Sequence, residues 1–445
     1  MVTDRDAAAA GTALTRVTST TALSAPAPEP TPTPSDAPRS LVLGLAFAQL
    51  GLYLTVLTPV LVTLALRVSQ LVPESGRGGR LSLVLSVGAV LAMLGNPLFG
   101  ALSDRTTGRF GRRRPWLLGG MAVAMAGLTV VALGDSILVL TLGWAVAQLG
   151  CNAALCALSS CLPDLIPEHQ RGRVSGLVGM MISVAMVTGS FLAQLFHGSL
   201  LLAFLVPGAI GLVAVVYLAS VMKDRPAAPG TFPPYRTKDF FGSFWISPRK
   251  HPDFARYFGA RFMIFVADSC VTSYQVYFLM DRLGFSRSEV AQKMFLGTLI
   301  MVGSTVVGSL LGGNLSDRWG RRKPFVLASA ALVAVALALM ALTGSYGLFL
   351  LAMAVFGFGE GLYLSVDMAI GASVLPDKDS SAQGMGVLNI AIAFPQSLVP
   401  MIAPAVLAIG AGSADGGQNY GALFLFGALC AAGGAVAARL IRSVT

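Results

Sequence analysis

Twelve long runs of apolar residues follow one another along the chain, and they constrain its fold more than any other feature. Each run is close to or above the roughly 20 residues with which an α-helix crosses the hydrocarbon layer of a bilayer. We therefore expect an all-α membrane protein with twelve transmembrane helices. The runs cover residues 41–66, 81–102, 116–133, 136–162, 174–197, 200–222, 258–280, 290–312, 325–343, 346–375, 384–410 and 418–438.

The composition supports a membrane location and excludes a soluble globule. Hydrophobic residues make up 55% of the chain and charged residues only 12%, which is too little charge for a soluble surface. The formal net charge of +10 does not indicate a nucleic-acid interface, because the basic residues lie in short turns between apolar runs. We expect the lipid bilayer and a small-molecule substrate as partners, no nucleic acid, and a monomeric protein.

One loop motif occurs twice. The first copy, Gly-Ala-Leu-Ser-Asp-Arg-Thr-Thr-Gly-Arg-Phe-Gly-Arg-Arg-Arg-Pro-Trp, occupies residues 100–116 and is here called the first loop. The second copy, Gly-Gly-Asn-Leu-Ser-Asp-Arg-Trp-Gly-Arg-Arg-Lys-Pro-Phe, occupies residues 312–325 and is called the second loop. A shorter echo, Leu-Pro-Asp, follows each loop at 162–164 and 375–377. The chain is therefore built from two related halves.

The runs and the repeat together predict the domain organisation. We place an N-terminal six-helix bundle at 41–222 and a C-terminal six-helix bundle at 258–445. Residues 1–40 are rich in proline and poor in apolar residues, which indicates a disordered tail and not a signal peptide. Residues 223–257 form a cytoplasmic linker. Its mixture of basic and aromatic residues suits contact with an anionic membrane surface, and a plain tether is the alternative.

The basic residues also predict the orientation of the chain. Most of the 31 Lys and Arg lie in the tails and in the loops that share a side with both termini. Basic loops stay on the cytoplasmic side of a membrane. We therefore expect a multi-pass protein of the cytoplasmic membrane, with both termini and both repeated loops in the cytoplasm.

The repeated Gly-x-Leu-Ser-Asp-Arg…Gly-Arg-Arg-x-Pro motif resembles the signature loop of the major facilitator superfamily, and the resemblance covers the chain from residue 41 to its end. The longer first loop is similar to the version in the sucrose transporter and glycoside-pentoside-hexuronide branch. The resemblance implies a major facilitator fold of two pseudo-symmetric six-helix bundles. It also implies a secondary transporter that works by alternating access, and not an enzyme.

The two loops are candidate conformational gates. A carboxylate at the end of a helix can pair with nearby guanidinium groups or cap the start of a neighbouring helix. The resemblance implies that these contacts clamp the two halves in one state and release them in the other, whereas topology alone is the simpler explanation of the arginines. The predicted gate residues are Gly100, Asp104, Arg105, Gly111, Arg112, Arg113, Asp317, Arg318, Gly320, Arg321 and Arg322.

Ionisable residues inside two of the runs are candidates for proton coupling. Arg261, Asp268 and Gln275 are spaced by seven, so they share one helical face. Glu360, Tyr363 and Asp367 share a face of a second helix for the same reason. Such groups are costly in a membrane unless they face a cavity or each other. We predict an Arg261–Asp367 ion pair, and we expect Asp268 and Glu360 near the midplane.

The cavity itself is predicted from the resemblance, which implies that the first, fourth, seventh and tenth helices line it. The candidate substrate-binding residues on these helices are Gln49, Tyr53, Gln148, Asn152, Gln275 and Tyr363.

The expected function is proton-coupled symport of a small polar solute such as a sugar or glycoside, driven by the proton gradient with no cofactor. A buried carboxylate can alternate between protonated and charged forms; a fixed structural role for Asp268 or Glu360 is the alternative. Run 81–102 holds no carboxylate, so it lacks the paired acids with which melibiose-type symporters bind sodium, and sodium coupling by that route is disfavoured. Residues 156–163 lack the arginine that plant sucrose symporters carry in the corresponding stretch, which disfavours sucrose itself as the substrate.

Other functions remain as alternatives. Proton-coupled efflux of drugs or metabolites is disfavoured, but not excluded, by the absence of proline from 176–189. A receptor, a channel or a membrane-embedded enzyme is disfavoured by the duplicated loops and by the scattered histidines. Cys151, Cys156 and Cys161 step by five along one run and turn away from one another, so we expect them to pack and not to bind a metal.

Overall fold

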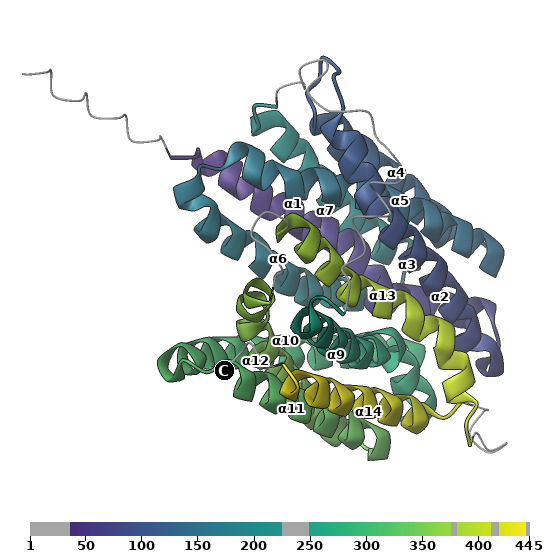
Figure 1. Cartoon of the computed structure of the whole chain (residues 1–445). Coiled ribbons are helices and arrows are strands. Elements are labelled where there is room, and N and C mark those ends of the chain that lie inside the picture. The colour runs from purple at the N-terminus through teal and green to yellow at the C-terminus, as the bar shows by residue number, and fades with distance from the viewer. Residues whose placement is uncertain (1–35, 225–248, 375–380, 411–417, 442–445) are drawn as a thin grey trace, which may run out of the picture. The chain divides into compact units, whose positions relative to one another are not determined.

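The computed structural model describes residues 36–224, 249–374, 381–410 and 418–441. The expected tail up to residue 35, most of the expected linker (225–248) and the second Leu-Pro-Asp echo (375–377) lie outside these described residues. The regular structure within them is helical (Figure 1).

Twelve helical segments of the described residues are long and apolar enough to cross a membrane, which confirms the prediction from the apolar runs. Two of them include a short wider π-helical turn: η1 lies within the first span, and η2 ends the seventh. The helices are α1 (Arg39–Thr58) with η1 (Pro59–Thr63) and α2 (Leu64–Leu71), α3 (Glu74–Asp104), α4 (Arg114–Leu133), α5 (Ile137–Leu165), α6 (Glu168–Leu195), α7 (Leu200–Val221), α9 (Pro252–Tyr277) with η2 (Phe278–Arg282), α10 (Arg287–Trp319), α11 (Lys323–Leu342), α12 (Tyr346–Ser373), α13 (Ser381–Leu407) and α14 (Tyr420–Arg439).

Several helices extend beyond the apolar runs that predicted them. The third helix in the chain, α3, begins at Glu74 and not at residue 81, and α10 continues to Trp319 and not only to residue 312. Hydropathy detects the part of a helix that lies in hydrocarbon, whereas the backbone hydrogen bonds continue through polar turns outside it. Charged residues such as Arg77 therefore belong to helices and not to loops.

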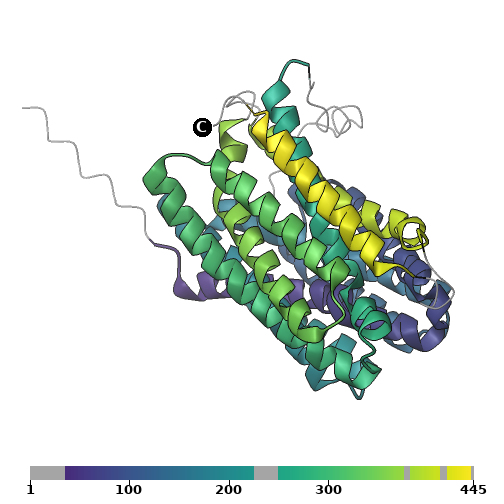
Figure 2. The same ribbon diagram turned by 90° about the horizontal axis from the view of Figure 1, so that it is seen from below.

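The first six spans pack mainly among themselves, and so do the last six. Helix α1 packs against α6 and α7, and α4 packs against α5 and α7; in the later part, α9 packs against α13 and α14, and α11 against α12 and α14. Figure 2 shows α14, in yellow, along this second group. The α3–α13 and α6–α10 contacts join the two groups. Glycines allow close approach: a Cβ at Gly127 of α4 would collide with the backbone of Ala147 on α5.

The two groups are joined at the end of the spans where α2 turns into α3, which we call the Arg77 end. Arg77 on α3 lies 3.4 Å from Asp281 on η2. The Tyr277 hydroxyl donates a hydrogen bond to the Ala65 carbonyl at 3.1 Å, and the Arg287 guanidinium binds the Ser69 carbonyl. We call the opposite end, where α3 turns into α4, the Asp104 end.

A hydroxyl relay adds to this junction. Pro404 has no N–H, so the carbonyl of Pro400 lacks its usual partner within α13. Ser82 on α3 donates to that carbonyl and lies 2.7 Å from the Tyr274 hydroxyl on α9. Because Ser82 has one proton, the Tyr274 hydroxyl must donate to Ser82. The relay satisfies a carbonyl that proline leaves free and links three helices.

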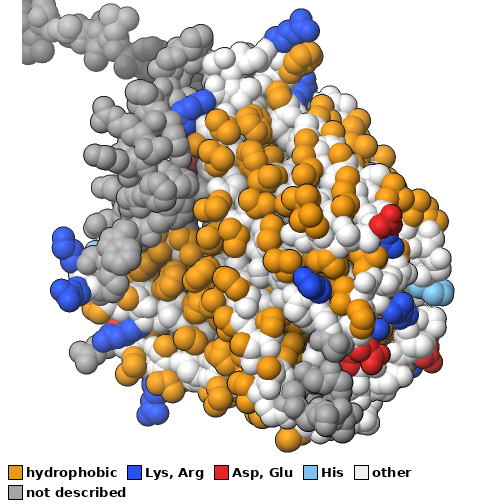
Figure 3. Space-filling view, turned by 90° about the vertical axis from the view of Figure 1, so that its right-hand side faces the viewer, with side chains coloured by type: hydrophobic (Ala, Val, Ile, Leu, Met, Phe, Trp, Pro, Cys, Tyr) orange, Lys and Arg blue, Asp and Glu red, His pale blue; other side chains and the backbone are white. Residues whose placement is uncertain are grey.

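The outer surface is that of a protein in lipid. Many large apolar side chains are exposed on the helices, among them Val213, Leu342 and Leu429. Figure 3 shows apolar side chains spread over one face, with most charged side chains towards its margins. Lipid covers such a surface without the free-energy penalty that water would impose. The expected packing role of Cys151, Cys156 and Cys161 agrees with their burial.

Candidate transport site and gate

The predicted ion pair between α9 and α12 is present. Arg261 Nη2 lies 3.0 Å from Asp367 Oδ2, and the two side chains are only 4% and 5% exposed. The Tyr257 hydroxyl lies one helical turn before Arg261 and donates to Asp367 Oδ1 at 2.5 Å. The Asp367 carboxylate is thus paired with a cation and also hydrogen-bonded, which is how a buried charge is stabilised.

Two polar groups beside this pair are incompletely satisfied. Arg261 Nε and Nη1 are buried and have no hydrogen-bond partner among the described residues. The Tyr363 hydroxyl is also buried without a hydrogen-bond partner among the described residues. The Tyr363 and Phe265 rings pack edge to face, with centroids 6.2 Å apart. Phe265 lies one turn after Arg261 on α9 and Tyr363 lies one turn before Asp367 on α12, so Tyr363 is a neighbour of the ion pair.

Asp268 and Glu360 differ from the ion pair, although they lie on the same two helices. Both are half-buried. Asp268 lies two helical turns after Arg261 and Glu360 two turns before Asp367 on helices that run in opposite directions, so the two carboxylates lie at the same level beyond the ion pair. Glu360 Oε2 accepts a 3.3 Å hydrogen bond from Thr305 on α10. Neither carboxylate forms an ion pair with any residue that the structure describes. These helices thus carry two acidic groups with no cationic partner in the described chain.

The other cavity candidates lie on the helices expected to line a central pathway. Gln49 and Tyr53 on α1 are half-buried, whereas Gln148 and Asn152 on α5 are buried. Asn152 donates a 2.8 Å hydrogen bond to the Gln148 backbone carbonyl. The side-chain oxygens of Gln148 and of Gln275 on α9 have no partner among the described residues. Their role in substrate binding stays a prediction.

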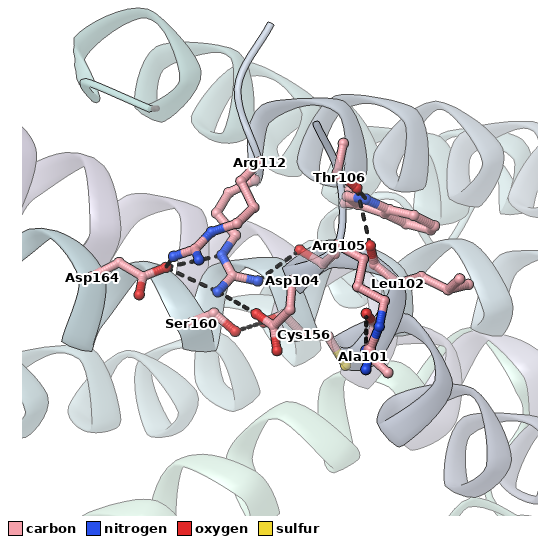
Figure 4. Close-up of polar contacts among 12 residues, drawn as sticks. Ala101, Leu102, Asp104, Arg105, Thr106, Arg112, Cys156, Ser160 and Asp164 are labelled. Carbon is pink, nitrogen blue, oxygen red and sulfur yellow. Dashed lines mark hydrogen bonds and ion pairs between the residues drawn. The ribbon is translucent and has the colours of Figure 1, made fainter. Parts of the chain in front are cut away.

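The first loop forms a compact charge network at the Asp104 end (Figure 4). Arg113 Nη2 lies 2.6 Å from Asp104 Oδ1 and 2.9 Å from Asp164 Oδ2, and its side chain is 5% exposed. Arg112 binds the same Asp164 carboxylate at 2.7 Å. Ser103 accepts a further 2.9 Å hydrogen bond from Arg113. The network joins the end of α3, the start of α4 and the end of α5, all within the first six spans.

The remaining residues of the first loop have distinct local roles. Arg105 donates to the Ala101 carbonyl at 2.9 Å. Gly111, one of the predicted gate residues, has a φ of 96°, in the left-handed region that favours glycine, so it makes a tight turn. Gly100 lies inside α3, where a Cβ would meet no neighbouring atom within 4 Å, so it is not required for close packing there.

The second loop has the same backbone plan but different contacts. Gly320 ends α10 with a φ of 62°, and the Lys323 ammonium binds the Ile441 carbonyl at 2.7 Å. Asp317 is exposed and makes no ion pair with a described residue, and Arg318 is exposed beside it. Arg321 and Arg322 precede α11. The predicted gate role of Asp317 therefore has no ion pair with a described residue to support it in this conformation.

Several residues in contact with these groups were not among the predicted site residues, and three of them differ in the signal that could have found them. Asp164 belongs to the Leu-Pro-Asp echo, so its repetition at the offset of the loops was a usable signal. Tyr257 lies four residues before Arg261, and helical periodicity could have placed it on the same face. Asp224 binds the start of α4 from beyond α7, and nothing in its spacing indicates that contact.

The comparisons with known proteins agree with this architecture. Residues 39–400 and 257–444 match the family model described as Major Facilitator Superfamily. Over 303 residues the chain is 28% identical to the class G tetracycline resistance protein of Vibrio anguillarum, covering 65% of this chain and 70% of that protein. A 38-residue segment is 53% identical to the uncharacterized symporter sll1374 of Synechocystis, covering 8% of this chain and 7% of that protein.

Solved structures share the fold. The crystal structure of the nucleoside transporter NupG superimposes with a TM-score of 0.68 at 16% identity. The match covers 90% of this chain and 98% of that chain. At this identity the likeness concerns the arrangement of helices and carries no information on substrate.

Proposed function

This chain belongs to the major facilitator superfamily of membrane transporters, and we propose that it couples the movement of a small solute to the movement of protons. The observation that carries the proposal is the Asp268–Glu360 pair, which lies half-buried within the spans without a cationic partner in the described chain. Ionisable groups at this depth mark ion and substrate pathways in membrane proteins.

The chemistry of two neighbouring carboxylates favours proton exchange. Like charges in a medium of low polarity repel strongly, and a bound proton removes that repulsion. Both groups are only half-buried, so helix packing does not enclose them completely. Asp268 and Glu360 can therefore bind and release protons as the surrounding helices move, and we assign them the coupling role.

Arg261 and Asp367 receive a structural role within this proposal. Their charges compensate each other at 3.0 Å, and Tyr257 provides a further hydrogen bond. Protonating Asp367 would leave Arg261 as an unpaired buried cation. Of the four predicted coupling residues, we therefore assign coupling to Asp268 and Glu360 and helix alignment to Arg261 and Asp367.

We propose that transport proceeds by alternating access, in which the two groups of helices move relative to each other. The Arg77–Asp281 contact and the Ser82 relay hold the two groups of helices together at the Arg77 end. Related halves that rock about a central site expose it to one side at a time. With the Asp104 end in the cytoplasm, as the basic residues predict, these contacts close the outer side of the protein.

Two substrate classes follow from different observations. The likeness to a tetracycline resistance protein over 65% of the chain supports export of a drug or metabolite in exchange for protons. The longer first loop and the short match to a symporter support uptake of a sugar or glycoside together with protons. Export is the candidate with the broader sequence support, and sugar symport is the second candidate.

The test separates exchange from energised accumulation in proteoliposomes. Radiolabelled tetracycline, sucrose and uridine serve as the first panel of probes. Asp268→Asn and Glu360→Gln should each abolish accumulation driven by a pH gradient while substrate exchange persists. Asp135→Asn, which neutralises an exposed carboxylate in the α4–α5 turn, is the control for charge removal. Undiminished accumulation in both site variants would contradict the proposal.

A further inference from the structure

The charge network of the first loop has a third carboxylate beside Asp104 and Asp164, contributed by the chain that follows α7. Helix α7 ends at Val221, and Asp224 lies three residues later. Asp224 Oδ2 accepts hydrogen bonds from the backbone N–H groups of Arg113 at 2.7 Å and Arg114 at 2.8 Å. These are the N-cap and first residues of α4, a helix start that has no side-chain cap of its own. A carboxylate satisfies such free N–H groups and favours the positive end of the helix.

The turn before α4 is shaped around this carboxylate. A Cβ at Gly111 would collide with the carboxyl group of Asp224, and the φ of 96° independently favours glycine. Arg114 closes the contact from the other side, since its guanidinium binds the Met222 carbonyl. Asp224 is therefore held in a site that exists only because residue 111 has no side chain.

The contact bears directly on the gate because Arg113 belongs to both sets of interactions. Its backbone N–H is bound by Asp224, while its guanidinium binds Asp104 and Asp164. The position of the Arg113 backbone determines whether the guanidinium can reach both carboxylates. Any displacement of the chain after α7 displaces Asp224 and therefore alters this geometry.

We propose that Asp224 is a positioning residue of the cytoplasmic gate, which fixes Arg113 between Asp104 and Asp164 and so stabilises the state in which the Arg77 end is closed. The proposal rests on the alternating-access function proposed above. Asp224 touches neither Asp268 nor Glu360 in the contacts described. Its effect is therefore on the balance between conformations and not on proton binding.

The second loop supports the assignment by comparison. Lys323, which corresponds to Arg114, binds the Ile441 carbonyl as Arg114 binds that of Met222. In each group, the basic residue at the start of the third span (α4 or α11) thus hydrogen-bonds a backbone carbonyl just after the sixth span (α7 or α14). The position that corresponds to Asp224 is Ser443, which lies outside the described residues. The sequence therefore places the acidic group in one half only.

The test measures the distance between the two groups of helices at the Asp104 end. Spin labels are attached at Ser175→Cys on α6 and Asn314→Cys on α10, both exposed positions, and distances are recorded in proteoliposomes without substrate or gradient. The protein without these two cysteines controls for labelling of the native ones, of which four are buried.

Asp224→Ala should shift the ratio of the two distance populations about fivefold towards the shorter distance, the change expected when one helix cap is lost. Asp224→Asn keeps an acceptor oxygen and should shift the ratio less. Gly111→Ala places a methyl group where the carboxylate lies and should shift it in the same direction. Glu168→Gln, which neutralises a carboxylate that is 88% exposed at the same end, should leave the ratio unchanged.

A purely structural role would lower thermal stability without moving the distance ratio. An unchanged ratio in Asp224→Ala and Gly111→Ala, or an equal shift in Glu168→Gln, would overturn the proposal. If Asp224→Ala does not fold, the Asp224→Asn and Gly111→Ala measurements decide in its place. The readout needs no proton coupling, so failure of the coupling role of Asp268 and Glu360 leaves this result interpretable, and the reverse also holds.

Discussion

Helices α9 and α12 carry two sets of charges that differ in how they are compensated. Arg261 and Asp367 form a buried ion pair completed by a tyrosine hydroxyl. Asp268 and Glu360 are half-buried, and the one hydrogen bond to their side chains from a described residue comes from a threonine. This difference shows that a position within the membrane span does not by itself identify a coupling residue; the compensation of its charge matters as well. A compensated charge holds helices together, whereas an uncompensated acid can bind a proton.

The largest expected effect comes from breaking the ion pair on one side. Arg261→Met leaves Asp367 buried without a cation, and we expect a loss of about 3 kcal/mol in the free energy of unfolding. Equilibrium unfolding in mixed detergent micelles measures this loss. The double variant Arg261→Met with Asp367→Asn removes both charges and should recover most of the stability. If the single variant is as stable as the unmodified protein, the pair is not the structural element described.

Removing the hydroxyl that completes the pair should have an intermediate effect. Tyr257→Phe deletes a hydrogen bond to a charged group, which corresponds to a loss of about 2 kcal/mol. The matched control is Tyr217→Phe, because Tyr217 is an exposed tyrosine on α7. The two variants are compared in the same unfolding assay. Equal stability of both would show that Tyr257 does not stabilise the Asp367 carboxylate.

The smallest effect is expected at the threonine beside Glu360. Thr305→Val removes the hydroxyl that donates to Glu360 and to the Met301 carbonyl, and polar contacts of this kind within membranes contribute about 0.6 kcal/mol. The control is Thr298→Val on the same helix, since the Thr298 hydroxyl is buried with no partner among the described residues. Its removal should be neutral or stabilising. A larger loss at Thr298 than at Thr305 would reverse this assignment.

Much of the architecture was predictable because membrane helices follow simple rules. Hydropathy alone identified the twelve spans, but it misplaced the start of α3, because Glu74 and Arg77 make the first turns of that helix polar. The spacing of seven residues from Arg261 to Asp268 and the matching face of the tenth span predicted the contact with Asp367. Periodicity succeeds there because a buried arginine has few possible partners.

The gate was only partly predictable. The repeated motif placed Asp104 and Arg113 among the gate residues, and the structure shows them 2.6 Å apart. It also suggested an equal role for Asp317, which makes no ion pair with a described residue. Asp224 could not have been found in the motif, because its contact depends on how the end of α7 meets the turn before α4. The repeated motif thus preserves the backbone conformation of the turn, but it does not preserve every side-chain contact of the loop.

The central claim is that Asp268 and Glu360 carry the protons that couple transport. The most direct test is to drive a transported probe down its concentration gradient into proteoliposomes and to record the internal pH with a trapped dye. The unmodified protein should move protons with the probe in symport or against it in exchange. The double variant Asp268→Asn with Glu360→Gln should move the probe with no proton flux. Proton flux of undiminished size in the double variant would contradict the account.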